Sequence, residues 1–153
     1  MYSKNQVSQI KQEFWTAFGW YMKPVPSAEG PPVNWKNYKT GIRHLYFRLK
    51  AERDFASISI EIQHPDADIG ELLYEQLFEL KHILEMELRE AWTWIPRDQD
   101  NPEHYRYTVE KKLEMVNVLE KKYWPEIISF LKPRILGLDA FWATARYGFE
   151  GLV

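Results

Sequence analysis

Two neighbouring runs of residues, at 44–50 and 55–63, alternate between apolar and polar side chains and constrain the fold of this chain more than any other feature. A period of two is typical of strands that bury one face. Residues 51–54 form a short, mostly polar turn, so the pattern predicts an antiparallel hairpin over about 44–63. One face of this hairpin is apolar, and the other carries Tyr46, Arg48, Lys50, Ser57, Ser59, Glu61 and Gln63.

Apolar residues at spacings of three and four predict three helices, over 4–22, about 69–90 and about 124–147. Ser3 and Gln6 have the spacing of a capping box at the start of the first helix. Asp68 is the expected N-cap of the long central helix. The last helix should continue through Pro133 with a kink, because its apolar positions keep helical register beyond that residue.

Shorter segments predict further strands, one at 33–38 and two or three within about 91–118. Because the strands are grouped as hairpins and are not separated singly by helices, the order of elements predicts an α+β fold. We expect a mainly antiparallel sheet of four to five strands, packed against the N-terminal helix, the long central helix and the C-terminal helix. The length of 153 residues indicates a single domain spanning 1–153.

The composition excludes several classes of protein. The chain has no cysteine, which excludes disulfides, thiolate metal sites and cysteine nucleophiles. No apolar run approaches the ~20 residues that a membrane helix requires. The N-terminal segment also lacks the uninterrupted apolar core of a secretory signal. We therefore expect a cytoplasmic protein with no membrane contact.

The charge is unevenly distributed along the chain. Residues 1–53 contain nine basic and three acidic residues, and residues 54–103 contain three basic and thirteen acidic residues. The last third, 104–153, has eight basic and six acidic residues. Segregated charge of this kind can guide association with a partner or with a second copy of the chain, although charged helix exteriors produce it too.

The familiar motifs of catalysis and of cofactor binding are missing. The seven glycines form no phosphate-binding loop, and the four histidines do not pair at metal-ligand spacing. Asp66, Asp68 and Gly70 resemble the start of a calcium loop, but Glu71 and Leu77 stand where such a loop needs a glycine and a bidentate glutamate. The sequence therefore predicts no catalytic residue, no cofactor and no obligatory metal.

An arrangement related to metal-dependent nucleases is the sharpest enzymatic hypothesis. Asp54 and Glu61 in the hairpin, with Glu13 in the first helix, would supply the carboxylates that hold Mg²⁺. The lysine that such sites place two positions after the second carboxylate is Gln63 here, and it carries no charge to stabilise a hydroxide. The sequence therefore favours a protein that is not an enzyme. A weaker hypothesis is an active site assembled from Arg48, Glu61 and His64.

The candidate binding residues lie on the polar face of the hairpin and just before it: Arg43, Tyr46, Arg48, Glu61 and Gln63. This face either is open to solvent and binds a partner, or is covered by a helix with Arg48 paired to Glu61. Basic and aromatic residues also interleave from Trp35 to Arg48, a pattern suited to stacking of bases and contact with phosphates. The acidic middle of the chain opposes that interpretation.

Several segments are similar to a bacterial family described as domain of unknown function 4268. They lie at 13–18, 34–42, 46–48, 58–62 and 124–134, and include Asn34-Trp35-Lys36-Asn37-Tyr38 and Trp124-Pro125-Glu126-Ile127-Ile128. The resemblance covers nearly the whole chain, as a stand-alone member, and implies no chemistry for any residue. Longer members of the wider family resemble fusions to a nuclease-like domain, so the resemblance implies, by association alone, an accessory role near nucleic-acid metabolism.

Together these observations favour a non-catalytic binding or regulatory module that acts through protein–protein contacts, with a homodimer as one form of such contact. The alternative is a nucleic-acid-binding domain or a degenerate relative of the metal-dependent nucleases.

Overall fold

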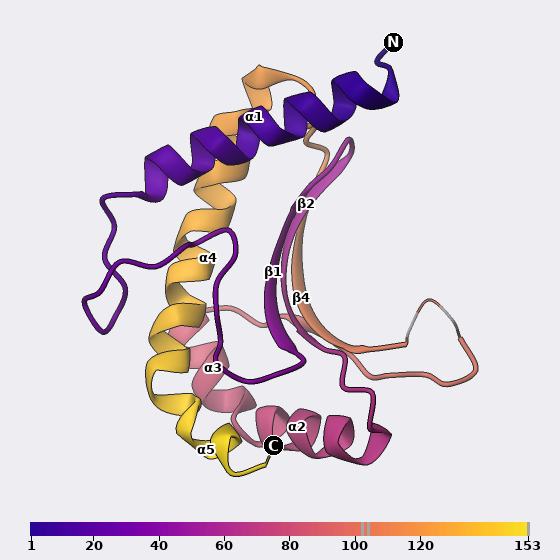
Figure 1. The fold of residues 1–153 in the computed structure, drawn as a ribbon, viewed down its shortest axis with the longest axis vertical. Helices are drawn as coiled ribbons and strands as arrows, with labels where there is room; N and C mark the ends of the chain where they lie inside the picture. The colour runs from indigo at the N-terminus through magenta and orange to yellow at the C-terminus, as the bar shows by residue number, and fades with distance from the viewer. Residues whose placement is uncertain (102, 104, 153) are drawn as a thin grey trace.

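The computed structural model describes residues 1–101, 103 and 105–152, and it has the predicted α+β architecture (Figure 1). Four strands form one sheet: β1 (Leu45–Ala51), β2 (Phe55–Ile62), β3 (Thr93–Ile95) and β4 (Tyr107–Glu114). The helices are α1 (Lys4–Met22), α2 (Ala67–Glu79), α3 (Lys81–Leu88), α4 (Trp124–Ala145) and the short α5 (Tyr147–Glu150), with a 3₁₀ turn η2 (Lys121–Tyr123) before α4.

The sheet is antiparallel throughout, in the order β1-β2-β4-β3. The hairpin pairs as the alternation requires, with Tyr46 opposite Glu61 and Arg48 opposite Ser59. β2 therefore lies between β1 and β4, and every residue of β2 after Phe55 is buried. Because β2 is the central strand, its two faces define the core on one side of the sheet and the polar face on the other.

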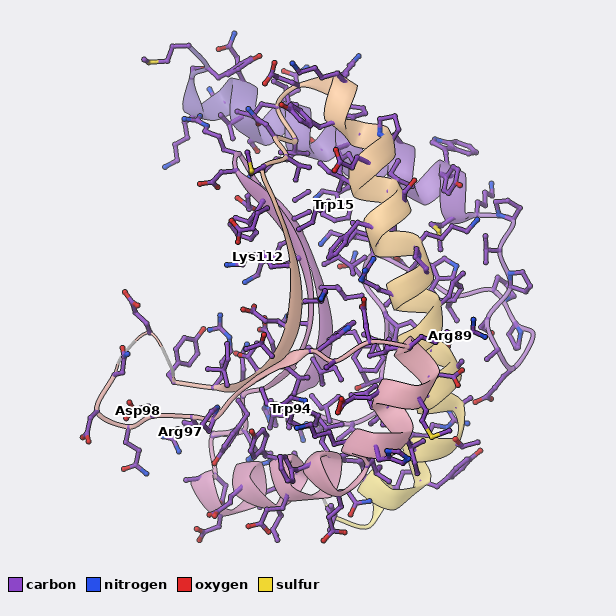
Figure 2. All side chains as sticks on the ribbon, turned by 180° about the vertical axis from the view of Figure 1, so that it is seen from behind. Trp15, Arg89, Trp94, Arg97, Asp98 and Lys112 are labelled. Carbon is purple, nitrogen blue, oxygen red and sulfur yellow. The ribbon has the colours of Figure 1, made fainter. Side chains whose placement is uncertain are left out.

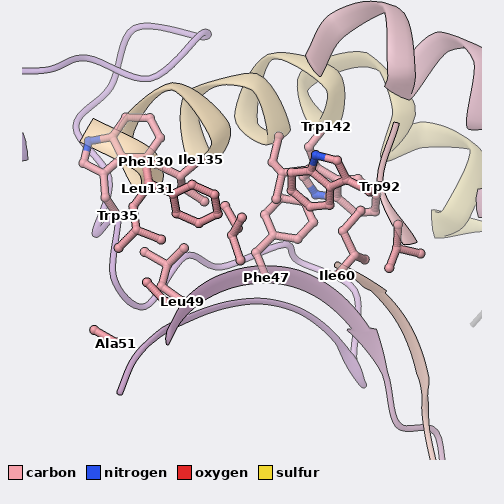
Figure 3. Packing of buried hydrophobic residues seen from close by; sticks show 14 of the residues in the cluster. Trp35, Phe47, Leu49, Ala51, Ile60, Trp92, Phe130, Leu131, Ile135 and Trp142 are labelled. Carbon is pink, nitrogen blue, oxygen red and sulfur yellow. The ribbon is translucent and has the colours of Figure 1, made fainter. Parts of the chain in front are cut away.

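The apolar face of the sheet packs against α4 (Figure 3). Phe47 of β1 and Ile60 of β2 lie between the sheet and the helix, where Phe47 meets the ring of Trp142 edge-on at 5.6 Å. Trp142 is only 2% exposed, and its indole nitrogen donates to the carbonyl of Thr40 at 2.7 Å. Burial of this apolar layer is the main stabilising contribution to the fold.

Helix α1 covers the predicted range and begins with the predicted capping box of Ser3 and Gln6. It crosses the first part of α4 (Figure 1), where Phe14 meets the ring of Trp124 edge-on at 5.5 Å. Phe14 and Phe18 are both completely buried. The N-terminal helix is therefore fixed to the C-terminal helix by aromatic contacts.

The segment between α1 and β1 is an ordered loop, and the strand predicted at 33–38 does not form. Tyr38 donates to the buried carboxylate of Asp139 on α4, and the backbone N–H of Ala28 donates to the other oxygen of that carboxylate at 2.7 Å. Because the loop's polar groups pair with α4 and with the edge of β1, the backbone does not need a partner strand.

The long helix predicted at 69–90 is two helices, because the chain turns at Leu80 (φ −93°, ψ 7°). The apolar stripe continues across this break, which is why spacing alone did not reveal it. The N-cap also differs: Asp66, rather than Asp68, accepts from the N–H groups of Asp68 and Ile69. The last helix runs uninterrupted through Pro133 to Ala145, and α5 follows as a separate turn.

The predicted range of strands at 91–118 contains the short β3 and the longer β4; Pro102 and His104, within it, lie outside the described residues. No strand forms at 115–118, because Met115 has a left-handed backbone (φ 62°) that ends the ladder. The chain then turns back toward the hairpin, and the N–H of Val118 donates to the carbonyl of Glu52.

Ile60→Ala tests the apolar layer between the sheet and α4. Ile60 is 1% exposed, so the substitution should lower the free energy of unfolding by about 2 to 5 kcal/mol. The same change at Ile83, which is 54% exposed, should alter it by no more than about 0.5 kcal/mol. Urea unfolding measures both, and equal losses at the two positions would contradict this packing.

Tyr38→Phe tests the contact between the loop and α4. Burial and the hydrogen bond to Asp139 raise the pKa of Tyr38 above its ordinary value. The Tyr38 hydroxyl therefore makes its full contribution to the free energy of unfolding below a pH of about 10, the pKa of an unfolded tyrosine. That contribution is lost as the pH rises further. We expect Tyr38→Phe to cost about 1 to 3 kcal/mol at neutral pH.

The variant should also lose less stability than the unmodified protein as the pH is raised through that value. Urea unfolding at a series of pH values measures the difference, with Tyr21→Phe, at a position that is 52% exposed, as the control. A pH dependence in Tyr38→Phe identical to that of the unmodified protein would contradict the role assigned to the hydroxyl.

Candidate functional site

The polar face of the sheet lies on the side away from α4. The sheet is curved, and no described helix lies across this side, which is bounded by α1 at one end and by α2 at the other (Figure 1). Residues opposite one another in the ladders share a face. On this basis the polar face comprises Tyr46, Arg48 and Lys50 from β1, Phe55, Ser57, Ser59 and Glu61 from β2, and Thr108, Glu110, Lys112 and Glu114 from β4.

Glu61 is the buried centre of the polar face. Its side chain is only 4% exposed although no described helix covers it, because the side chains of β1 and β4 close over β2. One carboxylate oxygen accepts from the hydroxyl of Ser59 at 3.0 Å, and the other accepts from the amide of Gln63 at 3.1 Å. Both oxygens of the carboxylate are therefore engaged within β2 and the residue that follows it.

Three cations converge on this carboxylate. Arg106 Nε lies 3.2 Å from it, and Arg48 Nε and Lys50 Nζ each lie 3.9 Å from it. The pairing of Arg48 with Glu61, which was expected only for a face covered by a helix, thus occurs on a face that no described helix covers. A buried carboxylate is stable as an anion only beside such partners.

These three cations keep their hydrogen-bond donors free. Across the described part of the chain, no side-chain hydrogen bond is donated by Arg48, Lys50 or Arg106, because the contacts with Glu61 are ionic and lack hydrogen-bond geometry. The Nε of Arg106 is fully buried and has no acceptor. The side chains of Arg48 and Lys50 are 46% and 43% exposed, so part of each is in contact with solvent.

Aromatic rings support the cations of this region. The guanidinium of Arg48 lies 4.1 Å from the ring centre of Tyr46, and that of Arg106 lies 4.5 Å from Tyr105. Lys112, which points away from α4 (Figure 2), lies 4.7 Å from the ring of Phe55. Such cation–ring contacts reduce the freedom of the long side chains and so hold their charged ends in place.

The positive charge also affects a neighbouring lysine. Burial, and then the positive charge of Arg48, lower the pKa of Lys36, which donates to the carbonyl of Leu49 on β1. Lys36 packs over the ring of Trp15 at 4.3 Å. The positive potential around Arg48 therefore extends beyond the polar face to the edge of β1.

The residues predicted for binding are only partly brought together. Tyr46, Arg48, Glu61 and Gln63 lie on or directly beside the polar face. Arg43 does not belong to a strand: it is exposed in the loop before β1 and lines a surface cavity of about 500 Å³ formed by residues 39–46. The sequence did not single out Arg106 and Lys112, although the alternation of 105–110 was the available signal for β4.

The carboxylates of the nuclease hypothesis do not come together. Asp54 precedes Glu61 by seven residues along an extended strand, a separation of roughly 23 Å at about 3.3 Å per residue. Glu13 is exposed on α1. Within the described residues no group of three histidine, aspartate or glutamate side chains could hold a metal ion. The aspartates of the apparent calcium loop instead begin α2.

The fold and this face define an α+β protein with a helix on one side of a curved sheet and a half-buried charged cluster on the other. A family model described as a domain of unknown function, DUF4268, matches residues 10–146. The chain therefore belongs to the DUF4268 family. No curated protein and no solved structure matches it significantly. In the part of the chain that is described, each helix is too short or too polar to cross a membrane.

The separation of Asp54 from Glu61 leads to a direct test of nuclease chemistry. We expect Mg²⁺ to leave the melting temperature unchanged and the protein to leave single-stranded and duplex DNA intact, because the two carboxylates cannot share an ion. Thermal unfolding and a gel-based cleavage assay measure these outcomes. Cleavage that disappears in Glu61→Ala but persists in Glu110→Ala would contradict this expectation and restore an enzymatic function.

Proposed function

We propose that the protein is a non-catalytic binding module that acts through protein–protein contacts, and that its partner binds on the polar face. The observation that carries this proposal is the set of cations around Glu61 whose donors are free. Arg48 and Lys50 lie beside a carboxylate already satisfied by Ser59 and Gln63, and nearly half of each of these two side chains is exposed to solvent. A partner can therefore bind these donors without displacing any hydrogen bond of the fold.

The residue types support a protein partner. Arginine and tyrosine dominate the energetics of protein interfaces. Here Arg48 lies on Tyr46, and Arg106 lies on Tyr105, which is 55% exposed. Because the ring contacts already restrict these side chains, binding would lose less conformational entropy than it would with free ones.

The mixture of charges also favours a protein over a nucleic acid. Glu110 and Glu114 share the polar face with the cations, and the net charge of the chain is −2. A phosphate backbone binds best to a surface that is positive along its length. A protein segment can instead place groups of both signs opposite the face.

Nucleic-acid binding is the second candidate function, and one specific observation favours it. Three cation–ring pairs occur on or beside the polar face, at Tyr46 with Arg48, at Phe55 with Lys112, and at Tyr105 with Arg106. Single-stranded nucleic acids bind to surfaces that combine stacking rings with cations.

Arg48→Ala tests the proposed function against a matched change, Arg89→Ala. Arg89 is also exposed, but it lies at the end of α3, on the other side of the molecule from the polar face (Figure 2). Proteins retained by the immobilised, unmodified chain would be identified and purified, and their dissociation constants measured with all three proteins. We expect Arg48→Ala to weaken binding about tenfold or more, and Arg89→Ala to leave it unchanged.

Equal affinity of all three proteins would show that the polar face is not the binding surface. Labelled single-stranded DNA and RNA would be titrated in parallel at several salt concentrations. Binding that weakens steeply with salt and is lost in Arg48→Ala would replace the proposed function with the second candidate.

A further inference from the structure

We propose that Arg48, Lys50 and Arg106 form an anion site that receives a carboxylate side chain of the protein partner. This inference rests on the proposed function, because it names the chemical group that the polar face would recognise.

The charges around Glu61 do not balance. Three cations lie within 3.9 Å of one carboxylate, that of Glu61, so the cluster as a whole carries an excess of two positive charges. Glu110 shares the polar face, but no cation among the described residues lies within ion-pair distance of it. The excess is therefore available to a second anion.

The three cations approach Glu61 from the two sides of β2. The guanidinium of Arg106 is held at the carboxylate with its Nε buried and without an acceptor, although its side chain as a whole is 21% exposed. Arg48 and Lys50 approach the same carboxylate from β1, each with nearly half of its side chain exposed. An anion that enters between Arg48 and Lys50 meets their partly exposed side chains and the charge of Arg106, the residue just before β4. A guanidinium suits an oxyanion with two oxygens.

The cations of this site are held in place before any partner binds. The rings of Tyr46 and Tyr105 support the two guanidinium groups, and the antiparallel ladder fixes β1 opposite β2. The internal carboxylate shows that the three cations accept this chemical group at close range. A carboxylate of the partner would be the same chemical group as that of Glu61, which the three cations already contact.

A phosphate would offer the same oxyanion chemistry. The carboxylate is favoured because Glu110, which lies on the same face outside this cluster, repels a doubly charged group more strongly than a singly charged one. Separate titrations with acetate and with inorganic phosphate distinguish the two groups.

The experiment is a titration of the full chain, labelled with ¹⁵N, with acetate and separately with inorganic phosphate at constant ionic strength. Spectra of the backbone amides and of the arginine Nε groups report binding. We expect saturable shifts from acetate at Arg48, Arg106 and the adjoining residues of β1 and β2. Arg48→Gln should weaken acetate binding about tenfold or more, whereas Arg89→Gln should leave it unchanged.

Glu61→Gln gives the sharper test. The amide keeps the size of the side chain and removes the internal anion that competes for the cations, so acetate should bind about tenfold or more tightly than to the unmodified protein. A role of these residues in folding alone would not produce tighter binding. If Glu61→Gln does not fold, the comparison of Arg48→Gln with Arg89→Gln still decides the matter.

The outcomes separate this inference from the proposed function. Saturation by phosphate without any response to acetate, or shifts that are equal in Arg48→Gln and in the unmodified protein, would overturn the carboxylate site. The proposed function would still stand if the protein partner bound and Arg48→Ala weakened that binding. Conversely, saturable acetate binding beside a partner affinity unchanged in Arg48→Ala would overturn the proposed function and leave the anion site.

Discussion

A carboxylate that is almost completely buried is stable as an anion only when cations and hydrogen-bond donors surround it. Glu61 meets this requirement with Ser59 and Gln63 close to it in sequence and with Arg48, Lys50 and Arg106 from beyond β2. Since β1 and the start of β4 must both deliver cations to it, the carboxylate favours one register for the three strands. The same requirement gathers the charges that form the candidate site.

The hairpin shows how much of the fold could be predicted. Its period of two places Tyr46 and Arg48 on the same face as Glu61, and the observed register pairs Tyr46 with Glu61. A shift of one residue would turn the apolar set toward solvent, so the alternation determined the pairing. The fold class followed from the grouping of strands between helices. These successes rest on local patterns that burial on one side of an element imposes directly.

The features that could not be predicted depend on contacts between distant residues. Arg106 reaches Glu61 only because β4 pairs with β2 across forty or so residues, and no local pattern encodes that neighbour. The break at Leu80 is hidden because apolar spacing continues from α2 into α3. The segment at 33–38 has the composition of a strand, but Tyr38 and Trp35 find partners elsewhere: the hydroxyl of Tyr38 donates to Asp139, and the indole of Trp35 to the carbonyl of Val25.

The edges of the sheet explain why a partner would meet the face of the sheet and not extend it. Binding by strand addition needs an edge with free backbone groups. At β1, Lys36 donates to the carbonyl of Leu49 and Thr40 donates to that of Leu45, so the preceding loop already occupies that edge. At the opposite edge β3 is only three residues long, and short edge strands resist pairing. Among the described residues, the last part of β4, beyond Glu110, has no strand partner on that side, whereas the polar face spans β1, β2 and β4. The polar face therefore offers a partner a larger part of the sheet than its edges do.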